Sequence, residues 1–343
     1  MNQFPEITIS GAPFERGVQH GTQLRREIGE TIAFYRSVFS LSEEQITERT
    51  SYFQAVIREF NQDYYDEIMG IASGANIDPL WIVALNSRTE LLSSSHSTVS
   101  KECTSLFFSE QAILGQNWDW GKAIEPLTVL MKIIRPDGHT IRMLTEPGII
   151  GKIGMNNHGL GVCLNILNNG KVLDGVPIHV ILRAILDCQT LAEVNSLLTQ
   201  HALGKASNVM VGDAKGNGFG LEFCSEKTYQ LQGEPDYLLH TNHYLGEEIN
   251  SPNNPDFNSS YARFTKATEL LSACNQKGAH EMQAILSDDS NAALPIYRDY
   301  VPSKLLKEDG TIFTIVMKLA KQEMHIRKGK GMNANFFVYG VTD

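Results

Sequence analysis

The hydrophobic pattern of this chain changes its period at Cys103, and that change limits the folds open to it. Upstream of Cys103, apolar residues recur at helical spacing and predict helices over residues 14–39, 53–72 and 79–92. Downstream, short β-type runs are separated by turn residues and fall into two groups with a pair of helices between them. This pattern predicts an α+β fold in which antiparallel sheets are covered by helices.

The strands are expected as runs joined by compact turns, of which Arg135-Pro136-Asp137-Gly138 is the strongest signal. The expected strands cover residues 6–10, 104–108, 113–118, 129–134, 140–144, 159–166, 208–211, 218–223, 228–232, 237–241, 311–317, 323–327 and 336–338. The expected later helices cover residues 178–187, 191–200, 259–273 and 280–286. The serine-rich residues 93–101 predict an exposed loop just before Cys103.

Composition excludes several classes of protein. The 343 residues carry 29 Lys and Arg against 39 Asp and Glu, a net charge of −10, whereas nucleic-acid binding needs clustered cations. The first residues lack the features of a signal peptide, and no run reaches the ~18 apolar residues of a membrane span. The 5 cysteines are an odd number without CxxC spacing, which predicts free thiols. We therefore expect a cytoplasmic protein with no nucleic-acid or membrane partner.

Cys103 is the first candidate for chemistry, although most cysteines in such a chain are packing residues. It stands where a polar loop ends and a strand begins, and Thr104 and Ser105 follow it directly. A free thiol has a pKa of about 8.5, so a nucleophilic cysteine needs a base. No histidine lies next to it in the sequence. Cleavage before Cys103 would solve this, because its own α-amino group, with a pKa near 8, would then serve as the base.

Three further clusters stand out, and each also has an ordinary explanation. Asp119 lies between Trp118 and Trp120, which is costly to bury without purpose but is also compatible with a surface turn. The run His240-Thr241-Asn242-His243 ends an apolar strand; a third metal ligand is missing, so zinc is not expected, and an Asn amide there could donate to an oxyanion. Arg298 precedes an acidic loop and, taken alone, is typical of a solvated surface cation.

Taken together, these segments resemble the acyl-coenzyme A:6-aminopenicillanic acid acyltransferase family, also classified as peptidase family C45, within the N-terminal-nucleophile (Ntn) hydrolases. The resemblance covers nearly the whole chain. Each motif is weak alone, but five in order form a specific signal: Gly11-Ala12-Pro13-Phe14-Glu15-Arg16-Gly17 with Gln19-His20-Gly21, Glu67-Ile68-Met69-Gly70-Ile71-Ala72-Ser73-Gly74 with Leu85-Asn86-Ser87-Arg88-Thr89-Glu90-Leu91, Cys103-Thr104-Ser105, Asn117-Trp118-Asp119-Trp120, and His240-Thr241-Asn242-His243.

The resemblance implies a precursor that cuts itself between Glu102 and Cys103. A mainly helical α-chain, residues 1–102, and a β-chain, residues 103–343, would stay associated as one αββα four-layer sandwich. The implied catalytic residues are Cys103 as nucleophile, Asn242 as oxyanion donor, and Asp119 and Arg298 as polar residues organising the site. The residues expected to contact substrate are Thr104, Ser105, Trp118, Trp120, His240 and His243. Many family members have Gly where this chain has Glu102, which could slow or regulate the cut.

The expected activity is hydrolysis or exchange of the acyl group of a linear amide, such as an N-acyl amine or N-acyl amino acid, through a Cys103 acyl-enzyme. Acyl-coenzyme A is a candidate donor in the transfer reaction, and we expect no cofactor and no metal. One alternative is an uncut thiol hydrolase that uses His240 or His243 as base. Another is an inactive binding scaffold. The sequence does not specify the acyl group, the amine or the oligomeric state.

Overall fold

The computed structural model describes residues 4–94, 103–168, 170–224, 227–231, 233–246, 258–329 and 335–343. Glu102 and residues 95–101 of the expected serine-rich loop lie outside the described residues, whereas residues 93 and 94 still belong to a helix. Within residues 4–94, the structure contains the helices α1 (Pro13–Gln23), α2 (Arg25–Val38), α3 (Glu43–Phe60), α4 (Gln62–Ala75), α5 (Pro79–Asn86) and α6 (Arg88–Ser94).

The three helices expected in this part of the chain are each broken in the structure, so their predicted continuity is wrong. Asn61 shows why apolar spacing misses a break: its backbone is extended, with φ −161°, and its side chain accepts from the N–H groups of Asp63 and Tyr64. The side chain thus caps α4 while the backbone ends α3.

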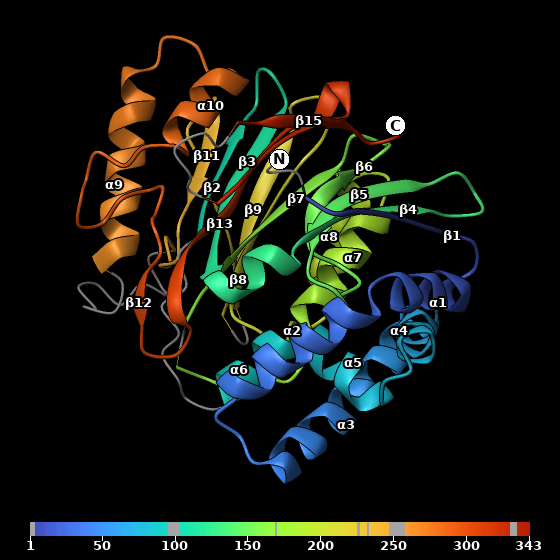
Figure 1. Ribbon diagram of the computed structural model, residues 1–343. Coiled ribbons are helices and arrows are strands. Elements are labelled where there is room, and N and C mark those ends of the chain that lie inside the picture. Colours follow the sequence, from blue (N-terminus) through green and yellow to red (C-terminus); the bar gives the residue numbers. More distant parts are fainter. Residues whose placement is uncertain are drawn as a thin grey trace.

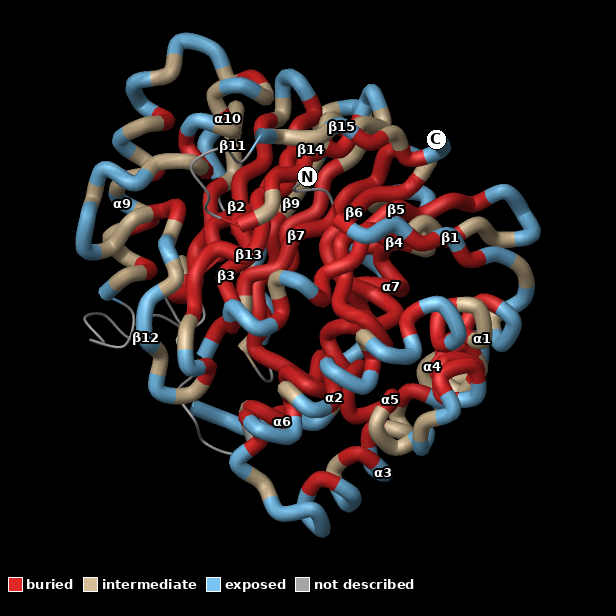
Figure 2. The backbone as a smooth tube through the Cα atoms, viewed as in Figure 1, coloured by how far each residue is buried: buried red, intermediate tan, exposed pale blue. Residues whose placement is uncertain are grey.

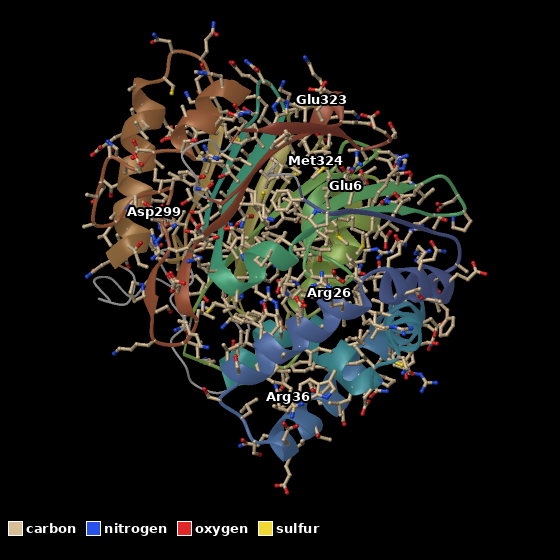
Figure 3. The ribbon with its side chains drawn as sticks, viewed as in Figure 1. Glu6, Arg26, Arg36, Asp299, Glu323 and Met324 are labelled. Carbon is tan, nitrogen blue, oxygen red and sulfur yellow. The ribbon has the colours of Figure 1, made fainter. Side chains whose placement is uncertain are left out.

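The exposed side of α2 carries Arg26 and Arg36, which are labelled in Figure 3 and whose side chains are 75% and 52% exposed.

The first sheet has eight strands. In spatial order they are β1 (Glu6–Ser10), β4 (Val129–Ile134), β5 (Thr140–Thr145), β6 (Ile153–Asn156), β7 (Gly161–Ile166), β8 (Ser207–Gly212), β9 (Gly218–Cys224) and β10 (Lys227–Gln230). The strands are antiparallel except that β1 runs parallel to β4, with Ile7 opposite Met131. The segment before Cys103 therefore contributes a strand to the sheet as well as helices.

The second sheet has seven strands. In order they are β11 (Tyr237–His240), β2 (Cys103–Phe108), β3 (Ile113–Gly121), β13 (Lys307–Lys318), β14 (Glu323–Lys328) and β15 (Phe337–Gly340), with β12 (Val301–Ser303) beside β13. The sequence reading missed β6 and β12. Strand β6 is only four residues long and contains Gly154, while β12 contains Pro302, which is tolerated because β12 lies at an edge.

The two sheets pack face to face, and helices cover their outer faces. Gln116 of β3 exchanges two hydrogen bonds with the backbone of Leu164 of β7, at 2.6 and 2.8 Å, which ties the sheets together. Helices α7 (Ile178–Asp187) and α8 (Leu191–Gln200) lie on one side, and α9 (Asn258–Ala273) and α10 (Ala279–Ile285) on the other (Figure 1). Two sheets between helices confirm the predicted αββα arrangement. The strands in the centre are buried almost throughout (Figure 2).

Helices α1 and α4 cross at very short range because both carry glycines at the contact. A Cβ on Gly17 would lie 2.1 Å from the carbonyl oxygen of Glu67, and one on Gly74 would lie 2.2 Å from that of Val18. Here the sequence motifs of the N-terminal region serve helix packing.

Beside this crossing, Glu67 accepts from Arg16 at 2.8 Å and from Arg183 of α7 at 2.8 Å. Arg183 also pairs with Asp187 at 3.0 Å. We call Arg16, Glu67, Arg183 and Asp187 the crossing network. It joins the helices before Cys103 to a helix that follows it. Among the described residues, no helix is long and apolar enough to cross a membrane.

Candidate active site

Cys103 is the first residue of β2 and lies on the inner face of the second sheet. It stands opposite Trp118 of β3, and its side chain is buried, with the residue 5% exposed. Ser105, two residues along and therefore on the same face, donates to Asn165 Oδ1 of the first sheet at 2.5 Å. The thiol therefore lies between the two sheets, where a polar group is shielded from bulk water.

Side chains from three distant segments hold the backbone of Cys103. Its N–H donates to Asn242 Oδ1 at 2.6 Å, and its carbonyl oxygen accepts from Arg263 Nη1 at 2.7 Å and Asn165 Nδ2 at 3.2 Å. Arg263 Nη2 also donates to Asn242 Oδ1 at 3.0 Å. We call Cys103, Asn165, Asn242 and Arg263 the nucleophile cluster. The cluster fixes both the backbone nitrogen and the backbone carbonyl of Cys103, which is unusual for a cysteine that serves only in packing.

The surroundings of the Cys103 thiol disfavour its ionisation in the uncut chain. Burial, assisted by the charge of Asp119, raises the pKa of the thiol to about 11. The backbone N–H of Asp119, the charge of Arg263 and the amide of Gln116 act in the opposite direction. The thiol is therefore protonated at neutral pH and needs a base before it can attack.

A small cavity adjoins the thiol. Its walls come from both sides of Cys103 in the sequence, with Trp118 and Trp120 from β3 and Arg88 from α6. The complete lining consists of Arg88, Thr89, Cys103, Gln116, Trp118, Asp119, Trp120, Lys152, Ile153, Leu164, Ile166 and His179. An apolar cavity with a few polar groups beside a nucleophile is typical of a small-molecule site.

The structure brings Trp118, Asp119 and Trp120 to this cavity, as the sequence reading placed them. Thr104 and Ser105 instead serve the neighbouring network: Thr104 Oγ1 accepts from Arg263 at 3.0 Å, and Ser105 bonds to Asn165. Both are buried, and neither is among the residues lining the cavity.

The two histidines near Asn242 are engaged elsewhere. His240 Nε2 contacts Glu222 Oε1 at 2.8 Å, and its Nδ1 contacts Thr241 O at 2.7 Å. His243 Nδ1 lies 2.8 Å from Ser260 Oγ, which also accepts from Asn242 N at 2.7 Å. Burial lowers the pKa of His243 to about 3. These contacts fix the loop that carries Asn242.

Arg298 and Arg263 take different places. Arg298 pairs with Asp309 at 3.2 Å, and neither its side chain nor that of Asp309 lines the cavity. Arg263 is the arginine that reaches Cys103, and Asn165 and Gln116 contact the same residue. The sequence analysis predicted a role for neither Arg263 nor Asn165, and it noted Gln116 only as part of the segment around Asp119. Arg263 lies 160 residues from Cys103 on α9, and no local pattern marks it. Among the described residues, no group of three or more His, Cys, Asp or Glu side chains could hold a metal ion.

Comparison with known proteins shows the family of this chain. A model of the family described as acyl-coenzyme A:6-aminopenicillanic acid acyl-transferase matches residues 108–333. The chain is 31% identical over 345 residues to the acyl-coenzyme A:6-aminopenicillanic-acid-acyltransferase 40 kDa form of Emericella nidulans, a match that covers 95% of this chain and 93% of the relative. The protein is an enzyme of the acyl-transferring class. It belongs to the acyl-coenzyme A:6-aminopenicillanic acid acyltransferase family.

Solved structures with similar folds are more distant. A mutant of the conjugated bile acid hydrolase from Clostridium perfringens shares 14% identity, with a TM-score of 0.48 over 69% of this chain and 92% of that one. The penicillin V acylase of Agrobacterium tumefaciens shares 14% identity, with a TM-score of 0.47 over 70% and 86%. The N-acylethanolamine-hydrolyzing acid amidase ortholog of Caenorhabditis elegans shares 15% identity, with a TM-score of 0.46 over 64% and 93%.

Proposed function

We propose that this protein is a self-processing cysteine amidohydrolase or acyltransferase that acts on linear amides through a Cys103 acyl-enzyme. One observation carries the proposal. Asn242 accepts from the backbone N–H of Cys103, while Arg263 and Asn165 donate to its carbonyl, beside a cavity lined by its thiol. The pairing of β11 with β2 ends at Ser105, so side chains take up the backbone groups of Cys103, and the nitrogen that Asn242 holds is the one that a cut before Cys103 would turn into a chain terminus.

In the first reaction, the Cys103 thiol attacks the carbonyl carbon of Glu102 and forms a thioester as the Cys103 nitrogen leaves with the thiol proton. The acyl shift thereby frees the α-amino group of Cys103, and water then hydrolyses the thioester, which regenerates the Cys103 thiol and releases the carboxylate of Glu102 and a proton. Residues 1–102 and 103–343 become two chains. They stay associated through β1, which pairs with β4, and through the bond of Glu67 to Arg183.

In the second reaction, the new α-amino group of Cys103 accepts the thiol proton, and the thiolate attacks the carbonyl carbon of a linear amide. An α-amino group titrates near 8, which suits proton transfer at neutral pH. Asn242 keeps this group oriented through Oδ1. The side-chain amide nitrogen of Asn242 has two N–H bonds. The carbonyl oxygen of Ile166 accepts one of them at 3.0 Å, so the second is the proposed donor to the oxyanion.

The acyl-enzyme then has two fates. Water gives hydrolysis, and an amine gives acyl transfer; in the transfer direction, acyl-coenzyme A is a candidate donor of the acyl group. The leaving amine takes the proton held by the α-amino group, so charge is conserved in each half-reaction. We place Asp119 at the cavity as a polar organiser of the site and transfer the role expected for Arg298 to Arg263.

The contacts of the histidines weigh against the uncut thiol hydrolase. In that alternative His240 or His243 would take the thiol proton, but the ring of His240 is held by Glu222 and Thr241, and that of His243 contacts Ser260. The binding-scaffold alternative predicts that removing the thiol changes nothing. Intact mass therefore separates the first alternative from the proposal, and turnover by Cys103→Ala separates the second.

A panel of N-acyl amines tests the proposal with wild type and Cys103→Ala. We expect turnover by wild type only, and an acyl adduct on the peptide that begins at Cys103 when the reaction is quenched early and analysed by mass spectrometry. Cys188→Ala is the matched control, because Cys188 is half-buried on the far side of the first sheet and should leave turnover unchanged. Equal turnover by Cys103→Ala and wild type would refute the proposal.

A further inference from the structure

The uncut chain has no α-amino group at Cys103, so the first cut cannot use the base that serves the processed enzyme. Burial raises the pKa of the Cys103 thiol to about 11, and the sulfur therefore needs a group that takes its proton as it attacks. His240 and His243 are engaged in the loop that carries Asn242. The base for the cut is therefore to be sought among the other side chains near the thiol.

The walls of the cavity beside the thiol offer three kinds of base. Among the described residues that line it, Asp119, Lys152 and His179 have side chains that can accept a proton. Burial lowers the pKa of His179 well below its usual range, and its Nδ1 contacts Gly151 O at 3.0 Å, so this ring is a weak base. Carboxylates are ordinarily weak bases too, since aspartic acid in water has a pKa of about 3.9. The amine of Lys152 is the strongest candidate.

Lys152 is held close to the nucleophile. It directly precedes β6, and its side chain is 3% exposed. Its Nζ lies 3.5 Å from the centroid of the Trp118 ring, and Trp118 stands opposite Cys103 in the second sheet. The amine and the thiol line the same small cavity, and Cys103 is among the groups that act on the charge of Lys152. A proton that leaves the sulfur can therefore reach the amine without entering bulk water.

The partners of Lys152 favour its neutral form. Glu146 Oε1 accepts from Lys152 Nζ at 2.6 Å and from Arg88 Nη2 at 2.5 Å. The guanidinium of Arg88 is enough to balance this carboxylate, so a charged Lys152 would be a second buried cation, which is costly. Burial, assisted by the charge of Arg88 and opposed by that of Glu146, lowers the pKa of Lys152 to about 7. A neutral amine still donates to Glu146, and its lone pair can accept a proton.

Resting on the self-processing proposed above, we propose that Lys152 is the general base of the cut before Cys103, its neutral amine taking the thiol proton as the sulfur attacks the carbonyl carbon of Glu102. The bond from sulfur to that carbon forms, and the bond from carbon to the Cys103 nitrogen breaks. Lys152 then passes the proton to the departing nitrogen and is neutral again. Lys152 thus serves the uncut chain, and the α-amino group serves the processed enzyme.

This role gives the cut a characteristic pH profile. The titratable and charged groups that act on Lys152 or respond to its charge are Glu146, Arg88, Cys103 and His179. Only the neutral lysine accepts a proton, so the rate constant of the cut should rise as the pH rises through about 7 and then level off. A hydroxide-dependent cut would instead keep rising tenfold per unit up to pH 9, and a carboxylate base would give a constant rate between pH 5.5 and 9.

The test follows the cut in the full chain. Labelled 343-residue precursor is synthesised in a cell-free system at pH 5.5 and diluted into buffers up to pH 9, and the appearance of the two fragments is measured on gels and by intact mass. Lys152→Met and Lys152→Arg should lower the rate constant by about 10²–10⁴-fold, the range for loss of a general base. Lys152→Arg is the sharper variant, because arginine keeps the positive charge and can donate to Glu146 but does not give up its proton.

Chemical rescue distinguishes a base from a structural lysine. Lys152→Ala leaves room for a small amine, so trimethylamine at pH 8 should restore part of the rate. Tetramethylammonium, a cation of similar shape without a lone pair, should not. Urea unfolding of the uncut Lys152→Arg and Cys103→Ala chains shows whether the arginine variant is folded. If it is not folded, the pH profile of wild type decides the inference, since that profile needs no variant.

Lys205→Met is the matched control. Lys205 is also buried, and burial lowers its pKa to about 8, but it is not among the residues lining the cavity. We expect Lys205→Met to be cut at the rate of wild type. Equal slowing by Lys205→Met and Lys152→Met would overturn the inference, as would a folded Lys152→Arg chain that is cut at the wild-type rate or a wild-type profile without a midpoint near pH 7.

Failure of this inference differs from failure of the proposed function. If wild type and Lys152→Arg are cut equally fast, the self-processing stands and the role of Lys152 is rejected. If wild type remains one chain at every pH, the self-processing is rejected, and the role of Lys152 in it is rejected as well.

Discussion

The crossing network and the nucleophile cluster are both built from buried polar side chains, and the contrast between them separates scaffold from chemistry. In the crossing network, Glu67 is enclosed by two arginines, and the side chains of Glu67 and Arg183 are fully buried. In the nucleophile cluster, the polar side chains converge on the backbone of one residue, whose thiol lines a cavity. The first network pairs its charges with one another, although Arg16 and Asp187 also line a separate cavity, whereas the second surrounds the backbone of one candidate nucleophile.

This difference matters because family motifs contribute to both regions. Arg16 and Glu67 belong to motifs as distinctive as the one that contains Cys103. In the structure, however, they pair with each other and do not line the cavity beside the thiol. A sequence motif therefore marks a constraint without saying whether the constraint is structural or chemical. Variants that affect stability in one region and rate in the other test the distinction.

The largest effect is expected from Glu67→Gln. It removes the carboxylate shared by Arg16 and Arg183, and breaking a buried pair costs about 3–5 kcal/mol of unfolding free energy. Glu308→Gln is the control, because Glu308 pairs with Lys122 at the surface and should contribute less than about 1 kcal/mol. Urea unfolding in the Cys103→Ala background measures both. Similar losses of unfolding free energy in Glu67→Gln and Glu308→Gln would contradict the structural role given to the crossing network.

The next effect concerns rate. Asn242→Ala should lower kcat by about 10²–10³-fold, or about 2.7–4 kcal/mol, the range for loss of an oxyanion donor. Asn86→Ala is a matched control: Asn86 is equally buried and donates to Gly148 O at 2.8 Å, but it is remote from the nucleophile cluster. It should lower stability and leave kcat of the folded enzyme unchanged. Equal kcat values for Asn242→Ala and wild type would exclude the proposed role.

The smallest effect is a dependence of stability on pH. Burial lowers the pKa of His20, which accepts from Gly148 N at 2.9 Å, to about 4. The unfolded chain, with a histidine pKa near 6.5, binds more protons between pH 6.5 and 4, so stability falls as the pH falls, by about 1.4 kcal/mol per unit. His20→Gln should flatten the stability profile between pH 6.5 and 5 by up to that slope. Superimposable profiles would show that His20 contributes nothing.

Much of the fold could be predicted because its elements follow local rules. The expected α7 and α8 match the structure at both ends, since apolar spacing acts within a few residues and Thr190 caps the first turn of α8. The helix break at Asn61 was missed because the residue that ends one helix also caps the next, while apolar spacing continues across it. Strand β6 was missed because its burial depends on neighbours far away in the sequence.

The residues of the candidate site likewise differ in whether the sequence predicts them. Cys103, Trp118 and Asp119 could be placed together because one hairpin joins them. Arg263 could not be placed there, since it reaches Cys103 from α9 and no local pattern marks it. A short local match led us to expect Arg298 in the site instead, but Arg298 pairs with Asp309. The contacts of Glu146 with Arg88 and Lys152 were equally hidden, because Arg88 lies far from the other two residues in the sequence.

Intact mass of the purified protein tests the central claim most directly. If Cys103 is freed as a chain terminus, active wild type consists of two fragments, residues 1–102 and 103–343, whereas Cys103→Ala remains one chain. A single unbroken polypeptide that turns over amides at full rate would contradict the account, because the thiol would then have obtained its base from elsewhere.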